Sequence, residues 1–520
     1  MTKLIRTYSA ALQGINAIQI DIEVNLLEKG IGENDNQEVI VGLPDTAVRE
    51  SRERVKSAIF ASGAPYPRGM VVVNLAPADL RKEGAAFDLP IALAKIAAAG
   101  GLSEEMLSET FAVGELALNG EVRSVRGVLS SALTAMKLAS KGIKNLIVPA
   151  DNAKEAAIAA KSLKVFPVST LREAIAAISG VALPLKQDAE TLFGEPDWSS
   201  IPDYADVKGQ AAAKRAMEIA AAGFHNILMI GTPGTGKSMI AKRLPGILPP
   251  MTIDETIETS KIHSSLGYLS SKDPLLRTRP FRAPHYTISD AGLLGGGTNP
   301  QPGEISLAHN GVLFLDELPE FKRNVLEVLR LPLENGEVTV SRAAGSFIFP
   351  SNFMLVAAMN PCPCGHLGDP RHRCRCRSLQ IQQYRSKISG PLLDRIDLHV
   401  EVPAISEDEL LSTRRGESSA EIRARVLKAR AIQEERYKND EHPILCNAKM
   451  ESAHFLKYCS MTTSMQTMLR HAIEQFGLSA RAYDRILRVA RTIADLAGSE
   501  EIRQEHLFEA IGYRVMDRKQ

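Results

Sequence analysis

The sequence predicts an α/β protein with a helical carboxyl-terminal region, and three observations support this. Short β-branched runs alternate with helical stretches over the first ~180 residues. A second alternating segment, from about Ala205 to Pro403, contains a glycine-rich loop between an apolar run and a helical stretch. From Ile405 onward the apolar spacing is almost entirely helical, as in 420–437, 463–476 and 479–497.

The amino-terminal segment, residues 1–180, is expected to be an α/β unit of its own. Its predicted strands are Ile18–Val24, Glu38–Val41, Gly69–Asn74 and Asn145–Val148, and its predicted helices are Ala47–Ser62 and Ser131–Lys141. Gly142 is a natural terminator for the second helix. Residues 181–204, rich in Asp, Glu, Pro and Ser, are predicted to be a linker in which Trp198 is a packing anchor. Residues 205–403 are expected to form a second α/β core with an inserted cysteine loop at 362–376, and residues 404–520 a helical lid domain.

Length and composition fit a soluble globular protein. The 520 residues suffice for about three domains at roughly 150 residues each. Lys plus Arg (62) nearly equals Asp plus Glu (61), which argues against a protein that binds nucleic acid over its whole surface but leaves room for a local basic patch. No apolar run approaches the ~20 residues of a membrane helix. The start of the chain has no apolar signal-peptide core, so we expect a cytoplasmic protein without a membrane partner.

The glycine-rich loop matches the G-x-x-x-x-G-K-[ST] pattern of a P-loop. An apolar strand pattern, His225–Ile230, precedes it and a helical pattern, Met239–Leu244, follows it. In that context the glycines turn backbone N–H groups toward phosphates, Lys237 reaches the β- and γ-phosphates of ATP, and Ser238 binds Mg²⁺. The predicted nucleotide-binding residues are Gly231, Thr232, Pro233, Gly234, Thr235, Gly236, Lys237 and Ser238.

Two further strand patterns end in polar residues. Gly311–Leu315 ends in Asp316 and Glu317, and an acidic pair at the carboxyl end of a parallel strand lies where such sheets bind ligands. We expect Asp316 to hold Mg²⁺ and Glu317 to polarise the attacking water. Phe353–Met359 ends in Asn360, which resembles the sensor residue of AAA+ ATPases. A turn-forming Asn before a proline is the alternative.

Two arginines are candidates for the same site. The segment Gly390-Pro-Leu-Leu-Asp-Arg395 resembles the arginine-finger segment of magnesium chelatases and MCM helicases, in which a neighbouring subunit supplies the guanidinium. Arg481 follows Ser479, a plausible helix N-cap, and resembles the sensor-2 arginine of the lid. A surface salt bridge is the alternative for each arginine.

Insertions and local motifs indicate one AAA+ branch. Arg282–Glu304 lengthens the path to Asp316, and Glu337–Pro350 is predicted as a β-hairpin with Arg342 near its tip. Both resemble the pore loops of the chelatase/MCM branch. Over nearly its full length the chain resembles the ComM/YifB family of magnesium chelatase-like proteins. Motifs carrying this resemblance start at Val41, Asp88, Asp206 and Asn360, reading VGLPDTAVRESRERV, DLPIAL, DVKGQ and NPCPCG.

The resemblance implies a P-loop AAA+ module with a carboxyl-terminal helical lid. It also implies a homo-oligomer, in that family a hexameric ring, that hydrolyses ATP with Mg²⁺ and drives branch migration of DNA during natural transformation. The alternative is a chelatase-type motor that remodels a partner protein and binds no DNA.

Residues 1–180 resemble a Lon-protease-like α+β domain through Gly114–Val122 and Lys141–Pro149. A Lon-type protease needs a Ser nucleophile and a Lys base in contact. Aligned by these flanks, the serine position falls on Ala86 and the lysine position on Leu129, so we expect no peptidase activity. Lys82 and Ser130 would restore the pair only in a different register.

Four of the six cysteines, Cys362, Cys364, Cys374 and Cys376, lie within fifteen positions. In a reducing compartment this crowding favours a metal site, and four thiolates are a usual structural Zn²⁺ set. His366 or His372 could replace one thiol. The interleaved arginines are candidates for contact with DNA phosphates, like Arg342, or with an acidic surface on the next subunit, and a solvated charge run is equally consistent with the pattern. They are Arg371, Arg373, Arg375 and Arg377.

Overall fold

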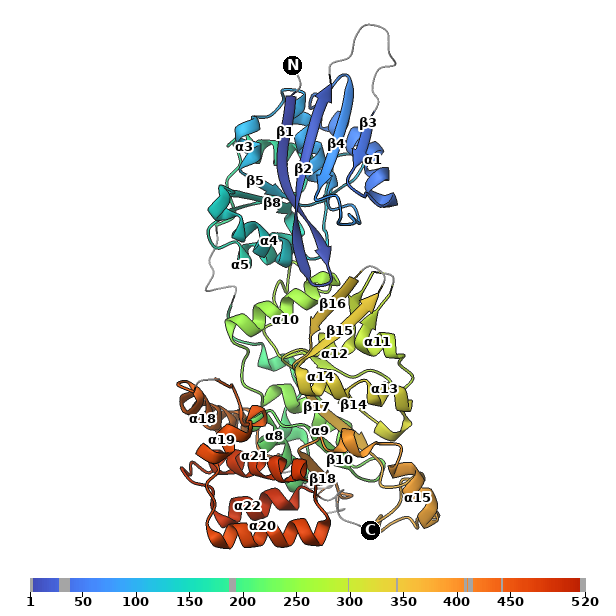
Figure 1. Ribbon diagram of the computed structural model, residues 1–520, viewed down its shortest axis with the longest axis vertical. Helices are drawn as coiled ribbons and strands as arrows, with labels where there is room; N and C mark the ends of the chain where they lie inside the picture. The colour runs from blue at the N-terminus through green and yellow to red at the C-terminus, as the bar shows by residue number, and fades with distance from the viewer. Residues whose placement is uncertain are drawn as a thin grey trace. The chain divides into compact units, whose positions relative to one another are not determined.

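The computed structural model describes residues 3–27, 38–186, 193–297, 299–342, 345–405, 409, 415–440 and 443–514. The chain divides into two compact units (Figure 1). Unit 1 combines Met1–Gly194 with Ile253–Leu276, and unit 2 combines Glu195–Thr252 with Arg277–Gln520. The segment Ile253–Leu276 therefore groups with the amino-terminal unit, whereas the sequence placed it in the second core.

Unit 1 is built on a seven-stranded mixed sheet in the order β3-β4-β2-β1-β5-β8-β9. The pairs β1–β2 and β2–β4 are antiparallel, and the other neighbours are parallel. A separate pair, β6 and β7, is antiparallel. The strands are β1 (Lys3–Gln13), β2 (Asn16–Leu27), β3 (Glu38–Val41), β4 (Met70–Ala76), β5 (Thr110–Ala112), β6 (Glu115–Leu116), β7 (Val122–Arg123), β8 (Asn145–Pro149) and β9 (Lys164–Val168).

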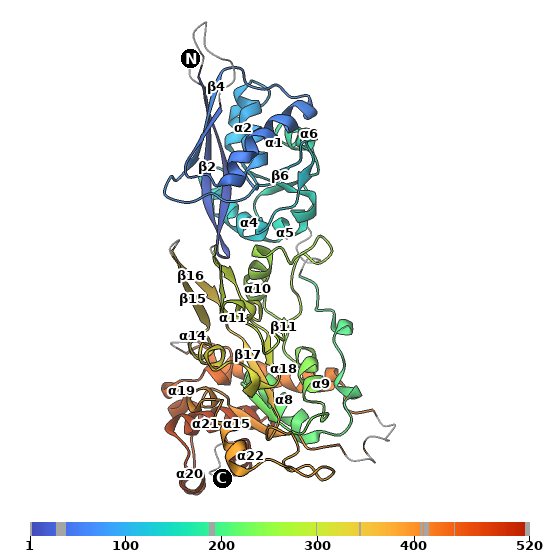
Figure 2. The same ribbon diagram turned by 90° about the vertical axis from the view of Figure 1, so that its right-hand side faces the viewer.

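Helices cover the buried face of this sheet. On β2 the buried positions alternate, at Ile20, Ile22 and Val24, and α1 and α2 lie together beside the sheet (Figure 2). All of α2 is buried. The helices are α1 (Thr46–Ser62), α2 (Asp88–Ala98), α3 (Glu104–Ser108), α4 (Val128–Lys137), α5 (Ala153–Ala159), α6 (Leu171–Ile178) and α10 (Ile253–Ser265), with 3₁₀ turns at Ala139–Lys141 and Ala150–Asn152.

Helix α10 is held to the rest of unit 1 by three hydrogen bonds. Gly127 N–H, at the start of α4, donates to Ser264 O at 2.9 Å, and the Ser264 hydroxyl donates to the Glu155 carboxylate. Lys261 Nζ donates to Asn16 Oδ1 at 2.7 Å. These long-range contacts place Ile253–Leu276 with unit 1. No local sequence pattern shows which core a helix packs against.

Unit 2 contains a five-stranded parallel sheet in the order β11-β14-β17-β10-β18. Three of its strands, β10, β14 and β17, are buried at every residue, as expected for a parallel sheet covered on both faces. Two hairpins, β12–β13 and β15–β16, lie outside the sheet. The strands are β10 (Ile227–Ile230), β11 (Phe281–Arg282), β12 (Gly295–Gly296), β13 (Gln301–Pro302), β14 (Val312–Leu315), β15 (Glu337–Arg342), β16 (Gly345–Pro350), β17 (Met354–Met359) and β18 (Leu398–Glu401).

The helices of unit 2 fall into those around the sheet and those of the carboxyl-terminal region. Around the sheet are α8 (Ala211–Gly223), α9 (Lys237–Arg243), α11 (Asp290–Leu294), α12 (Glu304–Leu307), α13 (Arg323–Glu327), α14 (Arg330–Asn335), α15 (Ser378–Arg385) and α16 (Gly390–Leu393), with 3₁₀ turns at Trp198–Ser200, Tyr204–Asp206, Leu244–Gly246 and Leu318–Glu320. The carboxyl-terminal helices are α18 (Ser419–Tyr437), α19 (Ser452–Tyr458), α20 (Thr463–Phe476), α21 (Ala480–Leu496) and α22 (Gln504–Gly512), with a 3₁₀ turn at Asn447–Lys449.

Several sequence-based details agree with this structure. The predicted hairpin is β15–β16, although Ala343 and Ala344 at its tip lie outside the described residues. Ser479 caps α21 by accepting the Ala482 N–H at 3.2 Å. Trp198 packs under the Arg423 guanidinium, 3.9 Å from the ring centroid. The mixed α/β fold with a helical carboxyl-terminal part is therefore confirmed.

Candidate ATPase site and metal-binding loop

The parallel sheet of unit 2 brings three predicted segments to one edge. Strand β17 lies between β10 and β14, with Ile230 opposite Met359 and Leu315 opposite Ala357. The P-loop follows β10, the acidic pair follows β14, and Asn360 follows β17. Because carboxyl ends of parallel strands share an edge, residues more than a hundred positions apart in sequence meet in one place.

The conformation of the P-loop depends on its glycines. Gly234 and Gly236 have φ values of 81° and 87°, in the left-handed region. Gly231 lies so close to β18 that a Cβ built on it would be 2.3 Å from Val402 O. The loop then enters α9 at Lys237.

Most of the predicted phosphate and magnesium residues line one cavity of about 400 Å³, whereas Gly231 and Thr232 of the P-loop are not among its lining residues. Ser238 Oγ donates to Asp316 Oδ2 at 2.6 Å. Lys237 Nζ donates to Gly231 O at 2.6 Å and lies 3.4 Å from Asn360 Oδ1. The lining residues are Pro233, Gly234, Thr235, Gly236, Lys237, Ser238, Met239, Asp316, Glu317 and Asn360.

The same cavity contains a buried lysine with a shifted pKa and a residue with a strained backbone. Burial lowers the pKa of Lys237, and the Asp316 and Glu317 carboxylates oppose this effect. Glu317 has φ 53°, a left-handed conformation that is costly for a residue with a side chain. Its N–H donates to Asp316 Oδ1 at 2.9 Å. Sequence reasoning did not anticipate this strain.

A further contact was missed from the sequence. Gln210 is buried, and its Nε2 donates to Thr235 O in the P-loop at 3.2 Å and to Pro403 O at 2.7 Å. Gln210 ends the Asp206–Gln210 motif that carried part of the family resemblance. Without the fold, nothing in that motif indicated contact with the phosphate loop.

Neither predicted arginine lines the cavity. Arg395 is 5% exposed, its Nη1 donates to Pro391 O at 2.5 Å, and its Nη2 pairs with Glu334 of α14. Arg481 has a side chain that is 60% exposed and lies 3.9 Å from Asp394. The five residues Lys237, Ser238, Asp316, Glu317 and Asn360 therefore meet within one chain, whereas the two arginines do not join them.

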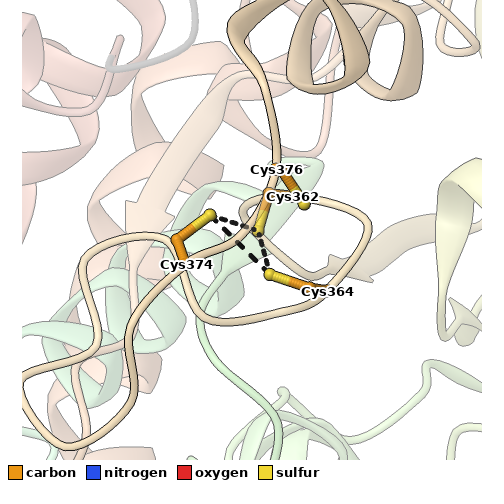
Figure 3. Close-up of side chains that lie close together, drawn as sticks. All are labelled: Cys362, Cys364, Cys374 and Cys376. Atoms are coloured by element: carbon orange, nitrogen blue, oxygen red, sulfur yellow. Dashed lines mark hydrogen bonds between the residues drawn. The ribbon is translucent and has the colours of Figure 1, made fainter.

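The four clustered cysteines converge on a common centre (Figure 3). The sulfur atoms of Cys362, Cys364 and Cys374 are 3.5, 3.7 and 3.7 Å apart, and that of Cys376 also lies within 4.8 Å of the others. Four thiolates at Zn–S bonds of about 2.3 Å would have edges of about 3.8 Å, so this set fits Zn²⁺. Backbone N–H groups, first that of Arg375, lower the pKa of Cys364 to about 6, whereas desolvation and the neighbouring thiols raise the pKa values of Cys374 and Cys376.

The histidines of this loop form a second cluster rather than replacing a thiol. The Nδ1 atoms of His366 and His372 both lie 3.2 Å from Asp369 Oδ2. The side chains of the loop arginines are exposed on the same segment, namely Arg371, Arg373, Arg375 and Arg377.

In unit 1, Ala86 and Leu129 occupy the positions aligned with the serine and lysine of a Lon-type protease. Ala86 O accepts the Gly114 N–H at 3.0 Å, and Leu129 is fully buried in α4. Lys82 Nζ donates to Pro77 O, whereas Ser130 Oγ donates to Ile15 O at 2.6 Å. Lys82 and Ser130 thus have different partners.

Three family models match the chain, all from the magnesium chelatase group. "Magnesium chelatase, subunit ChlI" matches residues 203–410, "Subunit ChlI of Mg-chelatase" matches residues 27–152, and its C-terminal model matches residues 416–514. Among the described helices, none is long and apolar enough to cross a membrane.

Similar curated proteins cover nearly the whole chain. Competence protein ComM of Haemophilus influenzae is 45% identical over 98% of this chain and 97% of its own length. YifB of Salmonella typhimurium is 42% identical over the same shares. The Magnesium-chelatase 38 kDa subunit of Cereibacter sphaeroides is 24% identical over 44% of this chain and 72% of its own. The chain therefore belongs to the ComM/YifB family of magnesium chelatase-like AAA+ proteins, whose membership implies an ATPase that uses ATP and Mg²⁺.

Proposed function

We propose that this chain forms a homo-oligomeric ring, a hexamer, that translocates on DNA and promotes branch migration of recombination intermediates in natural transformation. The proposal rests on one observation: the candidate catalytic residues do not all lie at the same cavity. Five residues of the ATPase site meet in one chain, whereas Arg395 and Arg481 lie outside the cavity that those residues line. A neighbouring subunit would supply the missing cation, which couples hydrolysis to assembly.

Each residue has a role that follows from its contacts. Lys237 and the P-loop N–H groups bind and orient the β- and γ-phosphates of the substrate. Ser238 and Asp316, already hydrogen-bonded at 2.6 Å, are the pair that would hold Mg²⁺, which neutralises phosphate charge when bound. Glu317 would polarise the attacking water and Asn360 would orient it. Arg395 from the next subunit would stabilise charge developing on the γ-phosphate.

The DNA assignment is supported by the name of the relative, a competence protein, and by exposed arginines. Arg342 ends strand β15 of the hairpin and is exposed, as are the four arginines of the cysteine loop. Zn²⁺ held by Cys362, Cys364, Cys374 and Cys376 would fix that loop. We place the protein in the cytoplasm, where DNA and ATP meet.

A chelatase-type protein remodeller is the second candidate, favoured by the similarity to the magnesium-chelatase subunit. ATPase measurements on the purified protein with branched, single-stranded and no DNA separate the two. The DNA motor predicts stimulation and ATP-dependent movement of a three-stranded junction. ATPase activity indifferent to every DNA, with no junction movement, would refute it, and light scattering of the ATP-bound protein tests the hexamer.

A further inference from the structure

Asn226, just before the P-loop strand β10, joins two other parts of unit 2 with one side chain. Its Nδ2 donates to Arg395 O at 2.9 Å. Its Oδ1 accepts the Leu355 N–H of β17 at 2.8 Å, in the strand that leads to Asn360. One amide thus holds the turn carrying Arg395 against the strand carrying the candidate sensor residue.

The main chain of Asn226 brackets the same turn. Its carbonyl accepts the N–H groups of Asp397 at 3.0 Å and Leu398 at 3.1 Å, and its own N–H donates to Asp397 Oδ2 at 3.1 Å. Asn226 therefore makes hydrogen bonds to the Arg395 carbonyl and also to Asp397, two residues further along the chain. A displacement of Asn226 would move the base of the Arg395 side chain.

His225 extends this connection to the lid. Its Nδ1 lies 3.3 Å from Asp397 Oδ2 and its Nε2 lies 2.8 Å from Thr492 Oγ1 on α21. Burial would raise the pKa of Asp397, but the Arg485 guanidinium at 2.8 Å and His225 hold it well below its usual range. Asp397 is therefore a carboxylate, bound to His225 and Asn226 of the core and to Arg485 of the lid helix.

The Asp397–His225–Thr492 arrangement has the chemistry of a nucleophilic triad, but burial excludes that role. His225 and Thr492 are 0% exposed and Asp397 is 2% exposed, so no substrate reaches the hydroxyl. Packing adds to the constraint, because a Cβ built on Gly223, the last residue of α8, would lie 2.1 Å from His225 Nε2. Gly223 leaves the space that the ring occupies.

We propose that Asn226 and His225 are positioning residues that set the Arg395 turn and tie it to the lid helix α21, so that lid position in one subunit controls the arginine offered to its neighbour. The inference rests on the proposed action of Arg395 on the adjacent subunit. Its physical basis is that a displacement of about 1 Å at a catalytic group can cost about 100-fold in rate.

The first test is the kinetics of Asn226→Asp and Asn226→Ala. Asn226→Asp keeps the shape and the acceptor for Leu355 N–H but loses the donor to Arg395 O. Because Asn226 does not line the ATP cavity, KM for ATP should stay within ~3-fold while kcat falls at least ~10-fold. Asn152→Ala is the matched control, since this amide makes the same kind of bridge, between Val125 N–H and Glu155, in unit 1. Unchanged kcat in the folded Asn226→Asp protein would overturn the inference.

Rings that contain two different variants distinguish a misplaced Arg395 turn from damage to the ATP site of the same subunit. Asn226→Asp rings, slow when alone, should regain activity when mixed with Lys237→Ala subunits, because the latter keep an intact Arg395 turn. Gly223→Ala, which displaces the His225 ring, should behave in the same way.

Arg395→Ala mixed with Lys237→Ala is the reference. If this reference recovers and the Asn226→Asp mixture does not, the positioning role is wrong while the proposed function stands. If the reference fails in verified mixed rings, the trans-acting arginine is refuted and the inference falls with it.

Discussion

Replacing Cys364 with serine should remove a bound zinc ion and weaken the phosphate loop. The three sulfur–sulfur distances, 3.5, 3.7 and 3.7 Å, are only about 0.1–0.3 Å below the edge of a Zn–thiolate tetrahedron, so binding needs little rearrangement. The cysteine loop also packs closely against the P-loop, since a Cβ built on Gly365 would be 2.8 Å from Pro233 Cγ. We therefore expect about one zinc per chain in the natural protein, and a fall in kcat/KM for ATP of roughly 10-fold, about 1.4 kcal/mol, in Cys364→Ser.

Elemental analysis of dialysed protein and steady-state ATPase assays check this prediction together. Cobalt substitution adds a spectroscopic check, because four thiolates give intense charge-transfer bands. Cys446→Ala is the control, as this buried cysteine lies outside the cluster and should leave the metal content unchanged. Zinc-free natural protein from zinc-supplemented cultures, or undiminished zinc in Cys364→Ser, would refute the reasoning.

Three further outcomes are expected. Glu317→Gln should bind a fluorescent ATP analogue normally but lose turnover by ~10²–10⁴-fold, the usual contribution of a general base, and substantial residual hydrolysis would contradict its assigned role. Gly231→Ala should abolish nucleotide binding, because its Cβ would lie 2.3 Å from the Val402 carbonyl oxygen, whereas Gly512→Ala, with nothing within 4 Å, should bind normally. Arg342→Ala should reduce the slope of log affinity for DNA against log salt by ~1 while leaving DNA-free ATPase intact, and an unchanged slope would remove Arg342 from the DNA contacts.

The sequence predicted individual helices and strands best, because their formation depends on neighbouring residues. The helices 46–62, 463–476 and 480–496 agree with their predicted ranges to within one residue at every end, because apolar spacing and caps such as Ser479 act over one turn. The strands β10, β14 and β17 were recognised as continuous apolar runs bounded by polar residues. Their order in the sheet followed only from the structure, since pairing depends on contacts between distant segments.

By itself, the sequence located the residues of the candidate ATPase site: the P-loop, the acidic pair after an apolar strand, and Asn360 after another. It also determined the cysteine set, because spacing within one loop constrains four thiols. Tertiary structure alone decided that Ile253–Leu276 packs with unit 1, that Gln210 supports the P-loop, and that Arg395 pairs with Glu334 within its own chain. Each of these depends on side chains meeting across long sequence separations, where burial and hydrogen-bond geometry, rather than local periodicity, choose the partner.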